Sequence, residues 1–254
     1  MEQMIRFTAV GTSHGDPTVE RYNYCSLIEF PGFGGVLVDA GNPALATLIR
    51  MRYSIADLRY IFITHTHMDH IGNLPDILKH VQKHRSGRKL IIFIPEIDAA
   101  ETILRFTELS HIPISPEVVE FRETRAGMIL EEDGLTVESI PTAHLEKTVT
   151  GKFPSSGYKF SFGGKKLLFT GDLAYDFHDF PAAEEVDLMV TELTHYPWET
   201  AFPVLGKAPF KRLIFSHIGD QYNSPEAKAK FRSFADQYCP YPCTVANDGD
   251  VFEI

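Results

Sequence analysis

Three histidines and an aspartate occur within six residues, directly after an apolar run that is typical of a buried strand. The run is Tyr60-Ile61-Phe62-Ile63, and the polar cluster is His65-Thr66-His67-Met68-Asp69-His70. Two histidines two residues apart at a strand end can both point into one cleft, and the Asp-His pair that follows can reach a neighbouring position. Imidazole and carboxylate ligands suit zinc, and also manganese or iron. The sequence therefore predicts a metal site at a strand end, with one loop able to serve two ions.

Apolar runs and helical patterns alternate along the 254 residues. Alternating and apolar runs predict strands at 5–10, 25–30, 35–39, 60–64, 89–94, 135–140, 158–162, 166–170, 186–192, 213–216, 244–246 and 251–254. Helical spacing predicts helices at 42–53, 74–84, 96–109 and 225–238. Mixed strands with interspersed helices indicate an α/β chain of two sheets between outer helices, and periodicity alone leaves the topology open. No linker is visible, so we expect one domain over 1–254.

Three more candidate ligands each come just beyond an apolar strand. His144 follows the strand that ends near Ile140, Asp172 follows Leu167-Leu168-Phe169, and His217 follows Leu213-Ile214-Phe215. Strand ends that converge on one edge of a sheet can bring distant residues together, with the loops carrying the chemistry. These residues therefore extend the predicted metal site beyond the first cluster.

These motifs resemble those of the metallo-β-lactamase-fold hydrolases over nearly the whole chain, and the resemblance implies a four-layer αββα sandwich of two mixed sheets flanked by helices. Carried over residue by residue, it implies that His65, His67 and His144 hold a first metal ion. Asp69, His70 and His217 would hold a second ion, and Asp172 would bridge both. Asp39, in Val36-Leu37-Val38-Asp39-Ala40-Gly41, matches a motif whose aspartate supports the site. The implied cofactors are two divalent ions, zinc first, with manganese or iron as alternatives.

Further stretches look like ribonuclease Z proteins and their phosphodiesterase relatives, namely 9–21, 70–75, 144–158, Ser216-His217 and Tyr222. Ribonuclease Z carries a long tRNA-gripping arm after the segment that matches Gly157-Tyr158, but here Asp172 follows Tyr158 by fourteen residues. The family motif His-Glu-Ala-Thr corresponds to residues 191–194, where the leading histidine is missing. His195 follows instead, as in small phosphodiesterase relatives, so Glu192 and His195 become candidates for supporting the metals or contacting phosphate. A strand-end cap and a solvent-facing histidine are the alternative interpretations.

The expected reaction is hydrolysis by water activated at the two ions, which also polarise the phosphoryl oxygen. As the resemblance implies, Asp69 would orient that water and accept its proton while also serving as a ligand, so its role would not be that of a base alone. Either His195 or a metal-bound water would protonate the leaving oxygen. We expect a phosphodiesterase for a small phosphodiester, a cyclic nucleotide or a short RNA. One alternative is a lactonase or thioesterase, which an aromatic pocket of Phe153, Tyr196, Trp198 and Phe202 would favour if those side chains are not core. Another is a non-catalytic metal-binding sensor.

The bulk properties set limits on partners and location. The net charge of −10 argues against a broad nucleic-acid surface, although residues 79–85 form a local basic patch that we expect to be a solvated helix end. Cys25, Cys239 and Cys243 do not form a disulfide framework, and neither a secretory signal nor an apolar span of about 18 residues is visible. We therefore expect a cytoplasmic enzyme without membrane contact, and the resemblance implies a homodimer.

Overall fold

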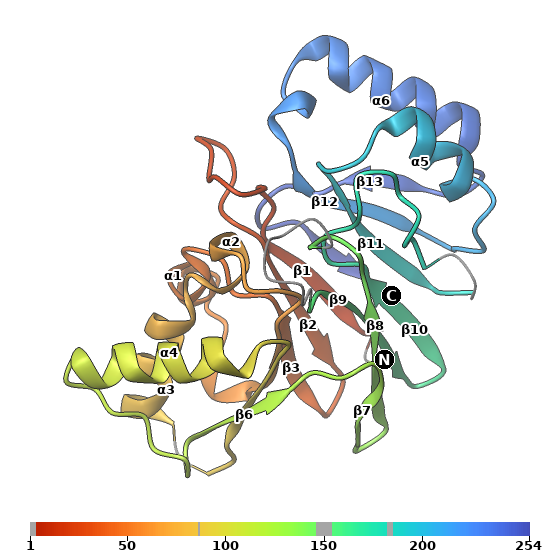
Figure 1. The fold of residues 1–254 in the computed structure, drawn as a ribbon. Coiled ribbons are helices and arrows are strands. Elements are labelled where there is room, and N and C mark those ends of the chain that lie inside the picture. The colour runs from red at the N-terminus through yellow and green to blue at the C-terminus, as the bar shows by residue number, and fades with distance from the viewer. Residues whose placement is uncertain (1–3, 86, 146–153, 182–184) are drawn as a thin grey trace. The chain divides into compact units, whose positions relative to one another are not determined.

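A computed structural model describes residues 4–85, 87–145, 154–181 and 185–254 (Figure 1). The chain divides into two compact units, which are residues up to Arg125 together with those from Asn247 onwards, and residues 126–246. Each unit is built on its own seven-stranded sheet. None of the helices in the described part of the chain is long and apolar enough to cross a membrane. The single domain over 1–254 stays a prediction.

The sheet of unit 1 is mixed. Its strands are ordered β14-β1-β2-β3-β4-β5-β6. Their bounds are β1 Arg6–Gly11, β2 Cys25–Phe30, β3 Gly34–Val38, β4 Leu58–Phe62, β5 Leu90–Ile94, β6 Val119–Glu123 and β14 Val251–Glu253. Neighbours from β14 to β3 pair antiparallel, and those from β3 to β6 pair parallel. The parallel half places the carboxyl ends of β3, β4 and β5 at one edge, where the loop of residues 63–67 leaves β4.

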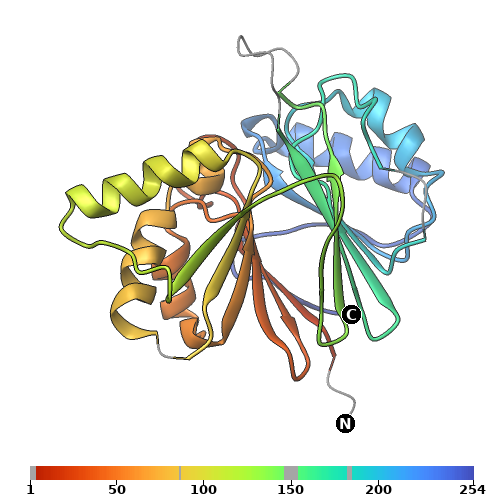
Figure 2. The ribbon, with the colours of Figure 1, turned by 60° about the horizontal axis from the view of Figure 1, so that its bottom comes forward.

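Helices cover the sheet of unit 1, and α3 and α4 lie together beside it (Figure 2). The helical elements are α1 Ala44–Arg50, η1 Ile55–Asp57, α2 Met68–Ile71, α3 Leu74–His84 and α4 Ile97–Leu109. α3 begins as predicted, with proline in its first turn. Its buried residues Leu74, Ile77, Leu78 and Val81 recur at helical spacing and join the apolar cluster of the sheet. This packing fixes the segment that follows α2.

The sheet of unit 2 has the same plan as that of unit 1. Its order is β13-β12-β11-β10-β9-β8-β7, antiparallel from β7 to β10 and parallel from β10 to β13. The bounds are β7 Gly127–Glu132, β8 Leu135–Pro141, β9 Ser156–Phe162, β10 Lys165–Phe169, β11 Leu188–Leu193, β12 Leu213–Ile218 and β13 Cys243–Val245. β9 and β10 form a hairpin through Gly163 and Gly164, both at positive φ. The stretch between Tyr158 and Asp172 therefore contains a tight hairpin instead of an inserted arm.

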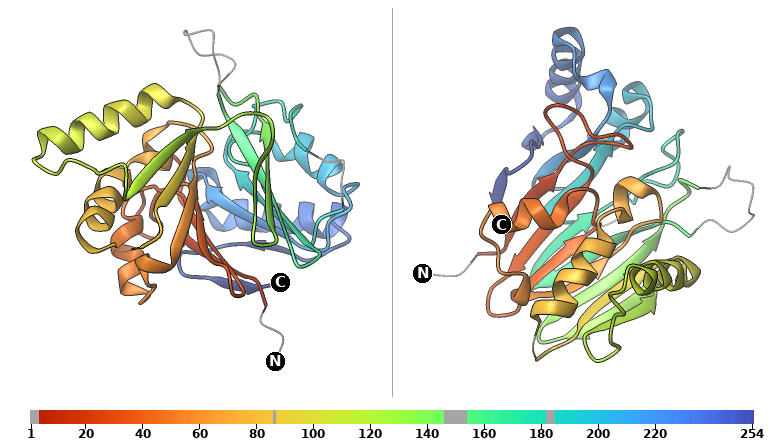
Figure 3. Two further views of the ribbon diagram at one scale, coloured as in Figure 1. Left: turned by 90° about the horizontal axis from the view of Figure 1, so that it is seen from below. Right: turned by 90° about the vertical axis from the view of Figure 1, so that its left-hand side faces the viewer.

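An aromatic core lies under the helices of unit 2, which are α5 Trp198–Leu205, η2 Asp220–Tyr222 and α6 Pro225–Tyr238. Phe202 is fully buried, and its ring lies 5.8 Å from that of Phe215 and 5.6 Å from that of Phe231. α6 begins as predicted at Pro225, and the Ser224 Oγ accepts a hydrogen bond from the N–H of Ala227 at 3.0 Å. Figure 3 shows from two further sides that α5 and α6 lie beside the parallel strands of this sheet.

The α/β class, with two mixed sheets flanked by helices, is confirmed. Most predicted elements lie within a few residues of the observed ones, although the predicted helix over 42–53 is only α1. Six of the described elements were not predicted, namely β6, β7, α2, α5 and the short 3-10 helices η1 and η2. β6 and β7 are edge strands rich in charged residues, as edges often are, and this charge hides the alternation of a strand. The predicted basic patch forms the exposed end of α3.

Candidate metal centre

The first cluster of ligands lies on one loop of unit 1. His65 follows β4, and α2 begins at Met68 and carries Asp69 and His70. The Nε2 of His65 lies 2.9 Å from the Nδ1 of His67, and the Nε2 of His70 lies 3.2 Å from the Oδ2 of Asp69. The rings of His65 and His70 have centroids 4.0 Å apart. Four predicted ligands of unit 1 are therefore together, and three of them are buried while His67 is exposed.

Asp39 supports this cluster from the end of β3. Its Oδ1 accepts a hydrogen bond from the N–H of Thr64 at 2.7 Å, and its Oδ2 accepts from the Thr64 Oγ1 and the His70 Nδ1, both at 2.8 Å. Burial raises the pKa of Asp39, and its bonds with His70 and Thr64 oppose that rise. A His70 ring that donates from Nδ1 presents Nε2 as the metal-binding nitrogen. This agrees with the predicted supporting role of Asp39.

The second cluster converges on one carboxylate oxygen of unit 2. The Oδ2 of Asp172 lies 3.7 Å from the His144 Nε2, 3.6 Å from the His217 Nε2 and 3.7 Å from the His195 Nδ1. Ligands about 2.0–2.2 Å from a tetrahedral ion are themselves roughly 3.3–3.6 Å apart. The spacing, the ligand types and the burial of Asp172 and His217 therefore fit a divalent metal ion.

Glu192 is a buried acceptor at the end of β11. Its Oε1 accepts from the N–H of Leu173 at 2.6 Å, while its Oε2 lies 2.9 Å from the N–H and 2.7 Å from the Nδ1 of His195. Glu192 thus does cap the strand end, and it also orients the His195 ring, whose side chain is 31% exposed. Asp172, Glu192, His195 and His217 can each offer an atom within 4.8 Å of the others. A purely solvent-facing His195 is excluded.

Positive φ angles mark the strand ends that carry the site. Asp39 has φ of 62° and His217 has φ of 49°, and Gly171, with φ of 62°, precedes Asp172. Left-handed backbone at a non-glycine residue is strained and persists where the surroundings enforce it. At His217 the carbonyl oxygen accepts a hydrogen bond from the Thr194 Oγ1 at 2.5 Å, within a stretch where the register of β11 and β12 shifts. The backbone at these ligands is therefore held by its neighbours.

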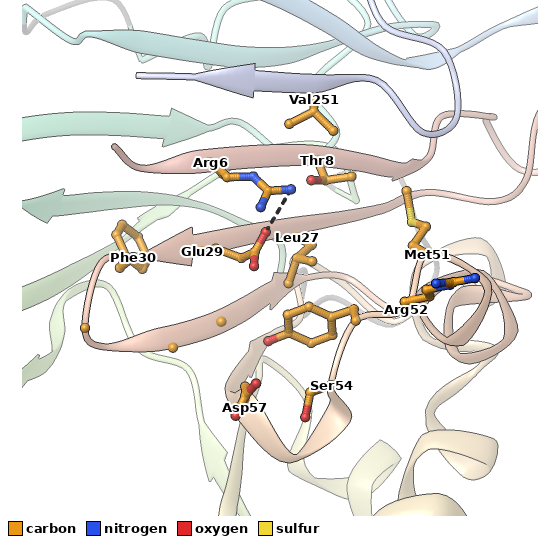
Figure 4. A pocket seen from close by; sticks show the side chains of 14 residues that line it. Arg6, Thr8, Leu27, Glu29, Phe30, Met51, Arg52, Ser54, Asp57 and Val251 are labelled. Atoms are coloured by element: carbon orange, nitrogen blue, oxygen red, sulfur yellow. Dashed lines mark ion pairs between the residues drawn. The ribbon is translucent and has the colours of Figure 1, made fainter. Parts of the chain in front are cut away.

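Two cavities differ in their relation to these clusters. A groove of about 660 Å³ lies over β1, β2 and β3 in unit 1, where Arg6 and Glu29 form an ion pair at 3.6 Å (Figure 4). It is lined by none of the predicted ligands. A smaller pocket of about 210 Å³ in unit 2 lies against His144 and His195.

The aromatic residues considered as a pocket wall for a lactonase or thioesterase are core residues where the structure describes them, which was the other interpretation left open for them. Tyr196, Trp198 and Phe202 are buried and belong to the apolar cluster under α5 and α6. α5, which was not predicted, turns Trp198 and Phe202 toward this core, and Tyr196 precedes the helix. Phe153 lies outside the described residues. Sequence patterns also did not reveal the role of Thr64, whose only signal is its position between β4 and His65.

Comparisons with known proteins place these motifs in a family. The sequence profile of the metallo-beta-lactamase superfamily matches residues 18–217. The chain is 23% identical to Ribonuclease Z of Archaeoglobus fulgidus, covering 91% of this chain and 94% of that protein. It is 21% identical to Ribonuclease Z 1 of Schizosaccharomyces pombe, covering 86% of this chain but only 32% of that protein.

Solved structures share the fold at low sequence identity. The metallo-beta-lactamase fold protein YhfI from Bacillus subtilis has a TM-score of 0.79 at 18% identity, covering 99% of this chain and 100% of that one. The short form of human tRNase Z has a TM-score of 0.75 at 20% identity, covering 97% and 98%. A diphosphatase from the PhnP family has a TM-score of 0.70 at 17% identity, covering 98% of each chain.

Proposed function

This chain belongs to the metallo-β-lactamase superfamily, and we propose that its two ligand clusters together hold two divalent metal ions that hydrolyse a small phosphodiester. The family and the relatives named Ribonuclease Z make it a metal-dependent hydrolase, so a non-catalytic sensor is set aside. In the proposed arrangement His65, His67 and His144 hold one ion. Asp69, His70 and His217 hold the other, and Asp172 bridges them.

The observation that carries the proposal is the convergence of three imidazole nitrogens on the Asp172 Oδ2, at 3.6–3.7 Å. One carboxylate oxygen surrounded in this way suits a bridging ligand, because its negative charge offsets the charge of the cations. When bound, two divalent ions lower the pKa of water toward ~7 and polarise a phosphoryl oxygen. The ligand types suit zinc, manganese or iron, and we propose zinc.

The residues around the ions have separate tasks in this proposal. Asp69, whose Oδ2 lies 3.2 Å from the His70 Nε2, orients the attacking water and accepts its proton. Glu192 holds the Nδ1 of His195, so the Nε2 of His195 delivers a proton to the leaving oxygen. Asp39 and Thr64 keep His70 in the tautomer that binds metal.

A small substrate is favoured over a transfer RNA. The β9–β10 hairpin occupies the stretch where a tRNA-gripping arm would be inserted, and the pocket beside His144 and His195 measures only about 210 Å³. With a net charge of −10, the chain does not provide a broad basic surface for a polyanion. We therefore propose a small phosphodiester, such as a cyclic nucleotide, or a short RNA.

A substrate panel tests the function. The chelator-stripped protein is reloaded with zinc or manganese and assayed on bis-(p-nitrophenyl) phosphate, a lactone and a nitrocefin-type lactam. We expect turnover of the phosphodiester that returns with the metal and is lost in Asp69→Ala. Asp98→Ala, which removes an exposed carboxylate of α4, is the matched control and should behave as the native chain. Hydrolysis of the lactone alone would overturn the proposal in favour of a lactonase or thioesterase.

A further inference from the structure

We propose that residues 173–180 form a preformed wall of a leaving-group subsite. This subsite binds the leaving group of the substrate, which is a small, uncharged alcohol with further hydroxyl groups. This inference rests on the proposed function and specifies its substrate. The wall lies wholly within unit 2, beside two residues of the second cluster, and its pocket is lined by Leu173, Ala174, Tyr175, Asp176 and His178 together with Ala143, His144 and His195.

The backbone of this wall is anchored at Phe177. Phe177 has φ of 62°, a conformation that bulky side chains rarely adopt. Its ring is buried, 4.5 Å from that of Phe180 and 4.4 Å from that of Tyr196, and its N–H donates to the carbonyl of Ala174 at 2.9 Å. Strain of this kind persists only where the surroundings enforce it, and it concentrates at functional sites. The conformation of this turn is therefore held by the packing of the Phe177 ring in the core.

Asp179 ties the same wall to the metal ligands. Its Oδ2 accepts a hydrogen bond from the N–H of Ala143 at 2.6 Å, and its two oxygens lie 3.1 Å and 3.2 Å from the N–H of Ala174. Ala143 precedes His144, and Ala174 lies two residues after Asp172. One carboxylate therefore joins the loops of two proposed ligands and sets the position of the pocket relative to them.

The rim of the pocket carries a histidine–aspartate pair. The Nδ1 of His178 lies 2.5 Å from the Oδ1 of Asp176, and both side chains are substantially exposed. Donation from Nδ1 to a carboxylate makes Nε2 the acceptor in neutral imidazole, which suits a hydroxyl group. Tyr175, also exposed, adds an aromatic face at the rim. These groups match an alcohol that has both carbon surface and hydroxyl groups.

Size and charge limit what the pocket takes. Its volume of about 210 Å³ is below the ~300–1,000 Å³ of sites that enclose whole drug-sized ligands, so it suits one substituent. The Asp176 carboxylate at its rim disfavours a second phosphate. His195 lines the pocket and is the proposed proton donor, so the group bound here is the leaving group. Water bonds to phosphorus, the bond from phosphorus to the alcohol oxygen breaks, and His195 supplies the proton to that oxygen.

Three methyl phosphodiesters test the subsite, with products followed by ³¹P NMR. Their second groups are 2,3-dihydroxypropyl, methyl, and an ethyl group that bears a phosphate. We expect the dihydroxypropyl diester to give methyl phosphate and glycerol, with kcat/KM at least about tenfold above that of dimethyl phosphate. The phosphate-bearing diester should be the poorest. Preferential release of methanol from the first diester would overturn the assignment.

Variants separate the subsite from the metal centre. His178→Ala should reduce the preference for the dihydroxypropyl diester over dimethyl phosphate to about twofold, and Asp176→Asn should narrow the discrimination against the phosphate-bearing diester about fivefold. His84→Ala, an exposed histidine of α3 in unit 1, should keep both ratios. Unchanged ratios in both subsite variants would overturn the subsite while leaving the proposed function intact.

The two proposals can fail separately. Turnover of bis-(p-nitrophenyl) phosphate without turnover of any methyl diester would overturn the subsite alone. Failure to hydrolyse any phosphodiester in the metal-loaded protein would overturn the proposed function, and the subsite with it.

Discussion

Units 1 and 2 share one sheet plan and yet supply ligands in opposite ways. In unit 1 all four proposed ligands lie within residues 65–70, on one loop and one short helix. In unit 2 the proposed ligands are far apart in the sequence: His144 follows β8, Asp172 follows β10 and His217 lies in β12. Both histidines meet the Oδ2 of Asp172. Both units follow three antiparallel strand pairs with three parallel ones.

This difference in how the ligands are supplied indicates which substitutions should disturb the ligand geometry of each unit most. The geometry of unit 1 is largely local, because neighbours in sequence are neighbours in space. The geometry of unit 2 depends on the register of β10, β11 and β12, which places Asp172 among the histidines. A single change at the shared carboxylate of unit 2 should therefore do more harm than a single change at a residue that only supports the loop of unit 1, such as Asp39.

The largest effect is expected for Asp172→Ala. Removing the carboxylate that three imidazoles share should lower kcat/KM by about 10³-fold or more and remove bound metal, because a metal ligand is lost and the cation charges are left uncompensated. Metal content by mass spectrometry and phosphodiester kinetics measure this. Retention of both metals and of activity in Asp172→Ala would contradict the claim that the ligand geometry of unit 2 depends on this shared carboxylate.

A smaller effect is expected for Glu192→Gln. The amide can no longer stabilise a protonated His195, so kcat should fall by about 10²-fold. The fall of activity at high pH, where His195 loses the proton that it donates, should move to lower pH. Metal content should stay near that of the native chain. The pH profile of kcat checks this. A profile of unchanged shape, or a loss of metal, would contradict the assignment of Glu192 to the His195 ring.

The next smaller effect is expected for Asp39, which supports the ligand cluster of unit 1. Asp39→Asn removes the charged acceptor of the His70 Nδ1, so metal affinity should fall by about 10–100-fold, as for other residues that orient a ligand. Competition with a coloured chelator measures the affinity. An affinity equal to that of the native chain would show that the loop of unit 1 is positioned without Asp39.

The smallest effect is expected at Asp187, which precedes β11 at the opposite end of the strand from Glu192. Partial burial alone would raise the pKa of Asp187, but the N–H of Lys166 and the ammonium groups of Lys211 and Lys165 hold it below its usual range. A lowered pKa in the folded state stabilises the fold above the unfolded pKa of about 3.9, and this contribution is lost as pH falls through the folded pKa.

Asp187→Asn should accordingly cost less than about 1 kcal/mol at pH 7, and its cost should vanish in acid. The free energy of unfolding, measured with denaturant at pH 7 and in acid, checks this. Activity and metal content at pH 7 should be unchanged. A loss of metal in Asp187→Asn would mean that Asp172→Ala acts through general damage to β10 and β11.

More of the ligand cluster in unit 1 than of the cluster in unit 2 could be predicted from the sequence. His65 to His70 were visible because they are contiguous and follow an apolar strand, and the structure brings them together. His144, Asp172 and His217 each had only the weak signal of a polar residue after a strand, and needed the family resemblance to be joined. Their meeting at one oxygen depends on strand register, which periodicity does not give.

Support residues and several elements were beyond the sequence patterns. Asp179 accepts hydrogen bonds from Ala143, 36 residues away, and no local pattern marks such a contact. The positive φ of Phe177 is enforced by aromatic packing that requires the folded core. α5 was missed because its aromatic residues and internal Pro203 do not give a clear helical signal.

The most direct test is anomalous diffraction at the zinc edge from crystals of the zinc-loaded protein. Two peaks are expected, one about 2.0–2.2 Å from His65, His67 and His144, the other at that distance from Asp69, His70 and His217, with Asp172 reaching both. Peaks held by the residues of one unit only, or none beside these side chains, would contradict the two-metal centre.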